Sequence, residues 1–267
     1  MDVYLPKVTI IVAVFNGAAT LERCLKSITV QSHRDKELIV MDGGSTDESV
    51  KILEGNTHAI DYWESKTDRG IYHAWNKAVS HATGEWICFL GADDYFWQYD
   101  VLERMVPSLQ QAQRRGIRLV YGRVTSVNKR NEVQNILGMP WYGKKSIHAH
   151  QMPPHPGLFH HMDIFNEKGN FDESFRIAAD YDLLLRELSD RAALFVPKII
   201  VAGMQCGGIS CNRKHLLRLF IEDAFARKKN GLRLITFPVL RYYSIILFNT
   251  LIAARGTKRK FKDSSMN

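Results

Sequence analysis

The chain contains the stretch Glu85-Trp-Ile-Cys-Phe-Leu-Gly-Ala-Asp-Asp-Tyr-Phe-Trp97, in which a short apolar run ends abruptly on two adjacent carboxylates. A run of this length, rich in aromatic and branched residues and preceded by Thr83-Gly84, predicts a buried strand. Asp93 and Asp94 then follow its carboxyl end, the edge at which open parallel sheets bind ligands. A divalent cation that carries phosphates would keep both carboxylates ionised, although a solvated Asp-Asp turn explains the same residues.

Strand and helix patterns alternate on both sides of this stretch. Strands are predicted at 8–14 and 37–41, with helical apolar spacing from Thr20 to Gln31 between them. This order at short spacing is typical of a doubly wound α/β sheet. The other expected elements are a helix opened by a capping box of Ser45 and Glu48, a strand at 60–63, helices at 71–82 and 100–115, a strand at 119–121, a hairpin at 124–133, a long connection at 138–156, a strand at 157–160, a helix at 162–168 and a helix that begins near Asp180. The long connection is interpreted as an acceptor-side loop or lid.

The bulk composition bounds the class of protein. With 267 residues, the chain forms one large domain or a domain with an appendage. A net charge of +8, concentrated late in the chain, favours an anionic partner such as a nucleotide, nucleic acid or acidic lipid. Four cysteines fit free thiols in a reducing cytosol better than a disulfide framework or a zinc site. No secretory signal is expected, and the apolar stretch 242–254 is too short to span a membrane.

A collinear set of motifs extends over residues 6–230. Its members are Pro6-x-Val-Thr-Ile-Ile-Val-x-Val-Phe-Asn16, Leu38-Ile-Val-Met-Asp-Gly-Gly-Ser-Thr-Asp47, Asp68-Arg-Gly-Ile-Tyr-x-Ala-x-Asn-Lys77, Ala82-Thr-Gly-Glu-Trp86, Leu90-Gly-Ala-Asp-Asp94, His155-Pro-Gly-x-Phe159, Gly169-x-Phe-Asp172, Ala179-Asp-Tyr-Asp-Leu183 and Gly207-Gly-Ile-Ser210. In this order they closely resemble the family 2 glycosyltransferases of the GT-A type. In detail they are similar to the bacterial branch that builds O-antigen, capsule and colanic-acid-type polysaccharides. The resemblance implies a GT-A fold, in which a mostly parallel, Rossmann-like sheet is flanked by helices.

The resemblance also implies a role for each matching residue. The nucleotide-sugar site would comprise Val14, Asn16, Asp42, Asp68, Arg69, Asn76 and Asp93. Asp94, together with Asp93, would bind Mn²⁺ or Mg²⁺ that bridges the diphosphate. Asp180 would be the base that takes the proton from the acceptor hydroxyl in an inverting reaction. His155 and Asp182 are expected to contact the acceptor.

Two departures from the family pattern concern the donor. Many relatives carry a second acidic residue after the position of Asp42, whereas this chain has Gly43. A carboxylate that contacts the base is therefore missing, although UDP remains the expected nucleotide. Where many relatives have Ala-Arg-Asn, this chain has Ala74-Trp75-Asn76, so an arginine contact to phosphate or base is absent, for which Arg69 could compensate.

Histidines form a second group of candidates. His148, His150, His155, His160 and His161 would bind zinc only if they converged, which the loop that holds them does not establish. His215 could approach the diphosphate or serve a structural role.

The C-terminal tail, 231–267, mixes apolar and aromatic residues with basic ones. It is expected to contact the inner-membrane surface peripherally, with a helix packed on the catalytic domain as the alternative. No nucleic-acid motif accompanies the charge, so nucleic acid is not an expected partner. The catalytic domain is then 1–230, with a nucleotide-binding half at 6–122 and an acceptor half at 123–230.

The sequence thus predicts a metal-dependent inverting glycosyltransferase. It would act at the cytoplasmic face of the inner membrane, moving a hexose or N-acetylhexosamine from a nucleotide-diphosphate sugar to a polyprenyl-diphosphate-linked glycan. The alternatives are a nucleotidyltransferase on a related α/β scaffold and a non-catalytic, membrane-associated assembly protein.

Overall fold

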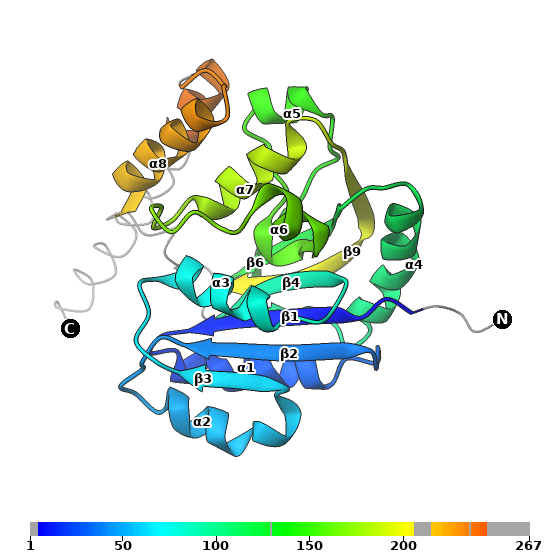
Figure 1. The fold of residues 1–267 in the computed structure, drawn as a ribbon, viewed down its shortest axis with the longest axis vertical. Helices are drawn as coiled ribbons and strands as arrows, with labels where there is room; N and C mark the ends of the chain where they lie inside the picture. Colours follow the sequence, from blue (N-terminus) through cyan, green and yellow to red (C-terminus); the bar gives the residue numbers. More distant parts are fainter. Residues whose placement is uncertain (1–4, 129, 206–214, 235, 245–267) are drawn as a thin grey trace, which may run out of the picture.

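Parallel strands built from branched apolar residues form the N-terminal half of a mixed sheet (Figure 1). Their order is β3 (Tyr62–Ser65), β2 (Lys36–Asp42), β1 (Val8–Val14) and β4 (Trp86–Gly91), and each neighbouring pair is parallel. The structure is a computed structural model that describes residues 5–128, 130–205, 215–234 and 236–244. These four strands confirm the Rossmann-like arrangement, which places their carboxyl ends at one edge.

The C-terminal half extends the same sheet with antiparallel and parallel pairs. Beyond β4 the order continues as β8 (Leu158–His161), β6 (Leu119–Val127), β9 (Ala193–Gln205) and β5 (Tyr95–Phe96), and β7 (Val133–Leu137) pairs with β6 as a hairpin. β8 is antiparallel to both β4 and β6, whereas β9 is parallel to β6. The predicted α/β class with a mixed sheet is therefore confirmed.

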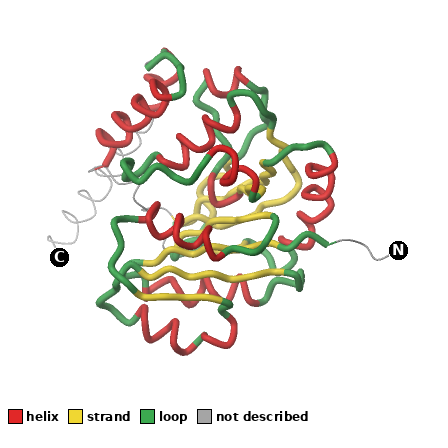
Figure 2. Tube along the Cα trace, viewed as in Figure 1, coloured by secondary structure: helices red, strands yellow, loops and turns green. Residues whose placement is uncertain are grey.

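Helices cover both faces of the sheet (Figure 2). One face packs against α1 (Ala18–Thr29), α2 (Ser49–Gly55) and α4 (Val101–Arg114), and the other packs against α3 (Ile71–His81), α6 (Asp163–Lys168) and α7 (Ala179–Leu188). The remaining helices are α5 (Lys144–His148), α8 (Leu216–Lys229) and the 3₁₀ turns η1 (Thr57–Ala59) and η2 (His155–Gly157). Residues 237–244 are also helical.

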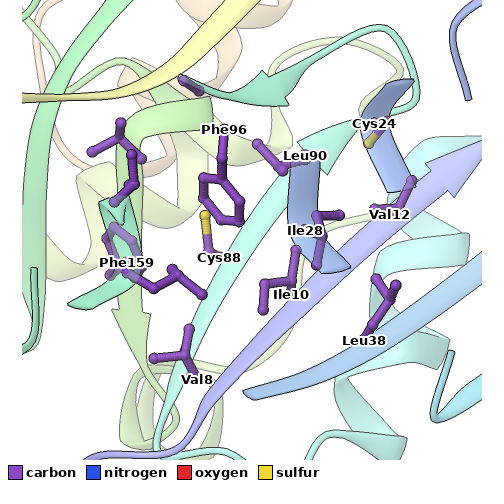
Figure 3. Packing of buried hydrophobic residues seen from close by; sticks show 14 of the residues in the cluster. Val8, Ile10, Val12, Cys24, Ile28, Leu38, Cys88, Leu90, Phe96 and Phe159 are labelled. Carbon is purple, nitrogen blue, oxygen red and sulfur yellow. The ribbon is translucent and has the colours of Figure 1, made fainter. Parts of the chain in front are cut away.

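The alternation of side chains along β1 explains the two cores. Ile10 and Val12 belong to the cluster on the α1 face, which Figure 3 shows, whereas Ile11 between them belongs to the cluster on the α3 face. Successive residues of a strand point to opposite faces. A strand covered by helices on both sides must therefore be apolar at nearly every position, as this one is.

Several expected boundaries differ from the structure. The strand expected at 60–63 begins two residues later, at Tyr62. The capping box of Ser45 and Glu48 is wrong, because α2 begins at Ser49 and no side chain caps it. The connection 138–156 contains the short helix α5.

Membrane-spanning helices are absent among the residues that the structure describes, since none of their helices combines sufficient length with sufficient apolarity. Only the first three residues of the apolar stretch 242–254 lie within the described part of the chain.

A buried ion pair attaches α7 to the sheet. Arg118, just before β6, donates from Nε to Glu187 Oε1 over 2.9 Å, and both side chains are almost completely buried. A second hydrogen bond joins Arg118 Nη2 to Glu187 Oε2, so the pair is bidentate. Arg118 also pairs with Glu167, whose carboxylate lies 2.6 Å from Nη1 but is about half exposed, so loss of Glu187 would remove the buried part of the pairing.

We expect Glu187→Ala to lower the free energy of unfolding by about 2 to 3 kcal/mol, because the Arg118 guanidinium would lose two charge-assisted hydrogen bonds and keep the half-exposed Glu167 as its ionic partner. Chemical denaturation followed by circular dichroism measures the change. The matched control is Glu48→Ala, whose ion pair with Lys51 is exposed and should matter by less than about 0.5 kcal/mol. If both variants lost the same free energy of unfolding, the stabilising role of the Arg118–Glu187 pair would be contradicted.

Candidate active site

The carboxyl ends of β1, β2 and β4 lie together at one edge of the sheet. The parallel register pairs Val14 with Asp42 and Ala13 with Gly91. The loops that follow these strands therefore start side by side. Val14 itself is buried, and its carbonyl oxygen accepts a hydrogen bond from Gly43 N over 2.9 Å, which joins two of these loops.

Asp42 organises the loop after β2. Its buried Oδ2 accepts hydrogen bonds from the backbone nitrogens of Gly44 and Ser45 and from Ser65 Oγ, over 3.0, 2.9 and 2.6 Å. Asn16 Oδ1 accepts from Thr46 N over 2.8 Å. The side chains of Asp42 and Asn16 are thus engaged by the protein itself, so they shape the loop from within.

Asp68 lies directly against this loop. Its Oδ1 accepts from Gly70 N over 2.8 Å. A Cβ atom added to Gly43 would lie only 2.7 Å from Asp68 Oδ2, so the absence of a side chain at position 43 admits the Asp68 carboxylate. Arg69, beside it, forms an ion pair with Glu173 in which Nη2 and Oε2 are 2.6 Å apart.

The carboxylate pair follows β4 as predicted. Asp94 is buried, and its Oδ2 accepts from Gly91 N over 3.2 Å, while Asp93 is partly exposed. Burial and the neighbouring charge of Asp93 raise the pKa of the Asp94 carboxyl to about 7. Arg23 of α1 donates to the carbonyl oxygen of Asp93 over 2.8 Å, so a cation lies behind the pair.

Asn76 and Trp75 are both engaged by other residues of the fold. Asn76 Nδ2 donates to the carbonyl oxygen of Phe171 over 2.9 Å, and its Oδ1 accepts from Phe171 N over 3.0 Å. Trp75 is buried and stacks on His155 with ring centroids 4.9 Å apart. The Asn76 amide thus holds the loop that carries Phe171, and its Nδ2 also donates over 3.2 Å to Glu173 Oε1, the ionic partner of Arg69, whereas position 75 belongs to the core.

Asp180 is the second residue of α7 and lines a pocket. Tyr72 Oη lies 3.1 Å from Asp180 Oδ1 and 2.5 Å from the carbonyl oxygen of Ile177. Burial raises the pKa of the Asp180 carboxyl, and the hydrogen bond from Tyr72 opposes that rise. Burial lowers the pKa of His155, which favours a neutral imidazole, and the Nε2 atom of His155 has no hydrogen-bond partner.

Asp182 points elsewhere. It is completely buried, with Oδ2 3.0 Å from Arg186 Nε and 3.2 Å from Lys229 Nζ, and Oδ1 accepts from Asn230 Nδ2 over 2.9 Å. Two residues along a helix rotate the side chain by about 200°, which places Asp182 opposite Asp180. Its placement therefore gives it a structural role, joining α7 to α8, in place of the expected acceptor contact.

The histidines serve separate parts of the fold. His150 Nε2 lies 3.1 Å from Asp223 Oδ2, His161 pairs with Asp163, and His155 and His160 are buried among aromatic rings. Within the described residues, no group of three or more histidine, cysteine or acidic side chains is placed to hold a metal. His215 is the N-cap residue of α8, whereas the expected Gly207-Gly-Ile-Ser210 motif lies outside the described residues, as do Cys206 and Cys211. Cys24 and Cys88 are free and buried.

The pocket beside Asp180 has a volume of about 890 Å³. Its walls come from the end of β7 and residues 149–156, from the first turn of α7, from Met204 near the end of β9, and from α8 with residues 237–242. His155 lines it together with Asp180. The loop 138–156 therefore does border the candidate base, as an acceptor-side loop would.

Two residues with important contacts were missed by sequence reasoning. Tyr72 belongs to a quoted motif, yet its sequence position gave no sign of its hydrogen bond to Asp180. Glu222 of α8 accepts hydrogen bonds from the backbone nitrogens of Arg176, Ile177 and Ala178, immediately before α7. Glu222 lies 44 to 46 residues after these three donors in the sequence, so no local pattern indicates the contact.

Comparisons with known proteins agree with this arrangement. The family model described as "Glycosyl transferase family 2" matches residues 9–169. A "PGL/p-HBAD biosynthesis glycosyltransferase" of Mycobacterium tuberculosis is 30% identical over 254 residues, covering 90% of this chain and 93% of that protein. An "Uncharacterized glycosyltransferase" of the same species is 30% identical over 75% of this chain and 74% of its own length.

Solved structures share the fold at low identity. The mannosyltransferase PcManGT from Pyrobaculum calidifontis, in complex with GDP-Man and Mn²⁺, matches with a TM-score of 0.64 and 16% identity over 99% of this chain and 81% of its own. TarS 1-349 of S. aureus in complex with UDP matches with a TM-score of 0.58 and 18% identity, and covers 74% of this chain, which spans 60% of the TarS chain. The fold is thus that of GT-A glycosyltransferases, and by the match over 9–169 together with its relatives at 30% identity, the chain belongs to glycosyl transferase family 2.

Proposed function

We propose that the chain is a metal-dependent, inverting glycosyltransferase. It transfers a hexose or N-acetylhexosamine from a nucleoside diphosphate sugar, with UDP as the expected nucleotide, to a lipid-linked glycan in bacterial surface-polysaccharide biosynthesis. The observation that carries this proposal is the position of Asp180, a partly buried carboxylate of α7 at the border of a pocket, in a fold whose strand β4 is followed by Asp93 and Asp94. Relatives and structural neighbours that bear glycosyltransferase names support it.

The donor would lie over the loops after β1, β2 and β4. Asp68 is the carboxylate that approaches the nucleotide base, since Gly43 leaves room for it. Asp42 and Asn16 act indirectly by holding the loop shape. Arg69 belongs to the same site through its position next to Asp68, with its charge balanced by Glu173.

The carboxylates of Asp94 and Asp93 suit a divalent cation. A buried carboxyl whose pKa is raised by a second carboxyl would be stabilised in its ionised form by a bound Mn²⁺ or Mg²⁺. Such ions are often held by one or two carboxylates together with phosphate oxygens, so two protein ligands suffice. When bound, the ion would neutralise charge on the departing diphosphate.

Asp180 supplies the base for the transfer. It removes the proton from the acceptor hydroxyl while that oxygen forms a bond to the anomeric carbon, and the bond from that carbon to the diphosphate breaks on the opposite side. The electron pair of the broken bond leaves with the nucleoside diphosphate. A carboxylate whose pKa is raised by burial is a stronger base than an exposed one, which favours this proton transfer. His155 lines the same pocket, so it is the expected contact for the acceptor beside Asp180.

We expect Asp180→Asn to leave the affinity for the donor nucleotide nearly unchanged and to reduce turnover by about 10² to 10⁴ fold, because only proton removal is lost. Calorimetry measures nucleotide binding, and release of free nucleoside diphosphate measures turnover. Equal turnover would exclude Asp180 as the base, and release of pyrophosphate would favour a nucleotidyltransferase.

A control for the same role uses the pH dependence of turnover. Asp180 must be deprotonated, so kcat should rise with pH through a pKa above that of an ordinary aspartate. Tyr72→Phe removes a hydrogen bond that stabilises the ionised carboxylate of Asp180. The pH at which kcat rises should therefore increase by about one unit. If the pH dependence of kcat were the same in Tyr72→Phe and the unaltered chain, Tyr72 would have a packing role alone.

We expect Asp94→Asn to weaken Mn²⁺-dependent nucleotide binding by about 100-fold while binding in the presence of chelator stays the same, because one metal ligand is lost. Calorimetric titrations with UDP, GDP, CDP and dTDP, each with Mn²⁺ and with chelator, identify the nucleotide in the same experiment. The matched control is Asp190→Asn, a more exposed carboxylate paired with Lys168. Binding that is equal with and without Mn²⁺ would refute the metal site.

The proposal places the enzyme peripherally on the cytoplasmic face of the inner membrane. An exposed stripe on α8 supports this placement, since Leu217, Ile221 and Phe225 are 72%, 57% and 52% exposed and recur at a spacing of four residues. Exposed Arg218 and Lys228 on the same helix suit anionic lipid headgroups. A lipid-linked acceptor, for which a polyprenyl diphosphate is the carrier expected from the sequence, would be presented at this surface.

We expect replacement of the three stripe residues by serine to reduce binding to vesicles containing phosphatidylglycerol by about tenfold, since apolar area is withdrawn from the interface. Cosedimentation measures the binding. The control replaces Leu5, Val30 and Val133, which are also about half exposed but lie outside α8. If the unaltered chain, the stripe variant and the control variant bound the vesicles equally, the membrane role of the stripe would be refuted.

A further inference from the structure

Three polar side chains in the wall of the pocket beside Asp180, those of His150, Tyr181 and Asp223, are occupied by one another or by neighbouring residues. Asp223 Oδ2 lies 3.1 Å from His150 Nε2 and also accepts a hydrogen bond from Tyr243 Oη. His150 Nδ1 lies 3.3 Å from Tyr181 Oη, which in turn accepts from Arg227 over 3.0 Å. This network spans the pocket wall and leaves its members little capacity to bind a ligand.

The rest of the wall is dominated by apolar side chains. Met139 and Met152 come from the loop 138–156 and Met204 from near the end of β9, and Leu219 and Phe237 line the same pocket from the C-terminal part of the chain. Methionine adapts its shape to varied apolar partners. A polar glycan placed along this methionine-lined part of the wall would bury hydroxyl groups without hydrogen-bond partners, which is unfavourable.

The pocket is also large enough to hold more of the acceptor than its reacting hydroxyl group. A volume of about 890 Å³ is near the upper end of the range for small-molecule sites. Asp180 lies at the border of the pocket. The part of the acceptor that occupies the pocket is therefore adjacent to the sugar whose hydroxyl gives its proton to Asp180. The ligand must therefore have an apolar body close to the reacting hydroxyl.

We propose that the acceptor carries an apolar aglycone, aryl or alkyl, joined directly to the sugar whose hydroxyl reacts, and that this aglycone lies in the pocket between Met152 and Leu219. The proposal rests on the proposed function and narrows its lipid-linked acceptor to one with no diphosphate between the apolar group and the reacting sugar, in place of the polyprenyl diphosphate expected from the sequence. A diphosphate linker at this place is disfavoured, because the carboxylates of Asp180 and Asp223 outnumber the Arg241 guanidinium among the residues that line the pocket.

The test measures binding of methyl, phenyl and octyl β-glucosides to the full chain saturated with UDP and Mn²⁺, by calorimetry below micelle-forming concentrations. The phenyl or octyl compound is expected to bind at least about tenfold more tightly than the methyl compound, as burial of apolar area requires. A preference for phenyl identifies an aryl aglycone, and a preference for octyl identifies an alkyl one. Equal affinities, or no binding by any of the three, would overturn the proposal.

Two variants locate the binding. Leu219→Asp places a charge in the pocket and should weaken the favoured glucoside at least about tenfold, whereas Val30→Asp, at an exposed apolar residue outside the pocket, should leave it unchanged. Equal losses would assign the binding to the outer surface and overturn the proposal. UDP affinity, measured in parallel, must stay constant in both variants. Loss of UDP binding by the unaltered chain would instead count against the proposed function.

Discussion

The carboxylate of Glu222 holds the segment on which the candidate base depends. It accepts hydrogen bonds from the backbone nitrogens of Arg176, Ile177 and Ala178, over distances of 2.8 to 3.1 Å. Backbone donors at the start of a helix have no partner within it, and a carboxylate there is favoured by the helix dipole. Asp180 follows two residues later, so its position is set by a side chain from the C-terminal helix α8.

The same helix also organises the pocket. Asp223, the neighbour of Glu222, binds His150 from the long loop, and Arg227 donates to Tyr181 of α7 and to the carbonyl oxygen of Ile147. One face of α8 thus fixes the start of α7 and the loop 138–156 relative to each other. The base and the wall that would receive the acceptor are therefore positioned together, while the opposite face of α8 presents the exposed apolar stripe.

The parts of the fold that sequence predicted are those with local causes. The strands β1, β2 and β4 follow from unbroken apolar runs, and Asp93 and Asp94 follow from the residues directly after β4. The leucines that follow Asp180 placed this residue near a helix start, which the structure confirms. The roles of Asn16, Asn76 and Asp182 could not be predicted in the same way, because short polar side chains take partners that only the tertiary structure supplies. For Asp182, helical periodicity alone already separates it from Asp180.

The donor side of the site was easier to predict from sequence than the acceptor side, because the two sides are built differently. The donor side is built from loops that directly follow parallel strands, so sequence order and register suffice to bring Val14, Asp42 and Gly91 to one edge. The acceptor side is built from segments that are distant in sequence and joined by side-chain contacts such as Glu222 to Ile177. Substitutions in those contacts would alter which acceptor fits while leaving the donor loops intact. A chain of this family can therefore keep its nucleotide chemistry and still acquire a new acceptor through changes confined to the loop 138–156 and α8.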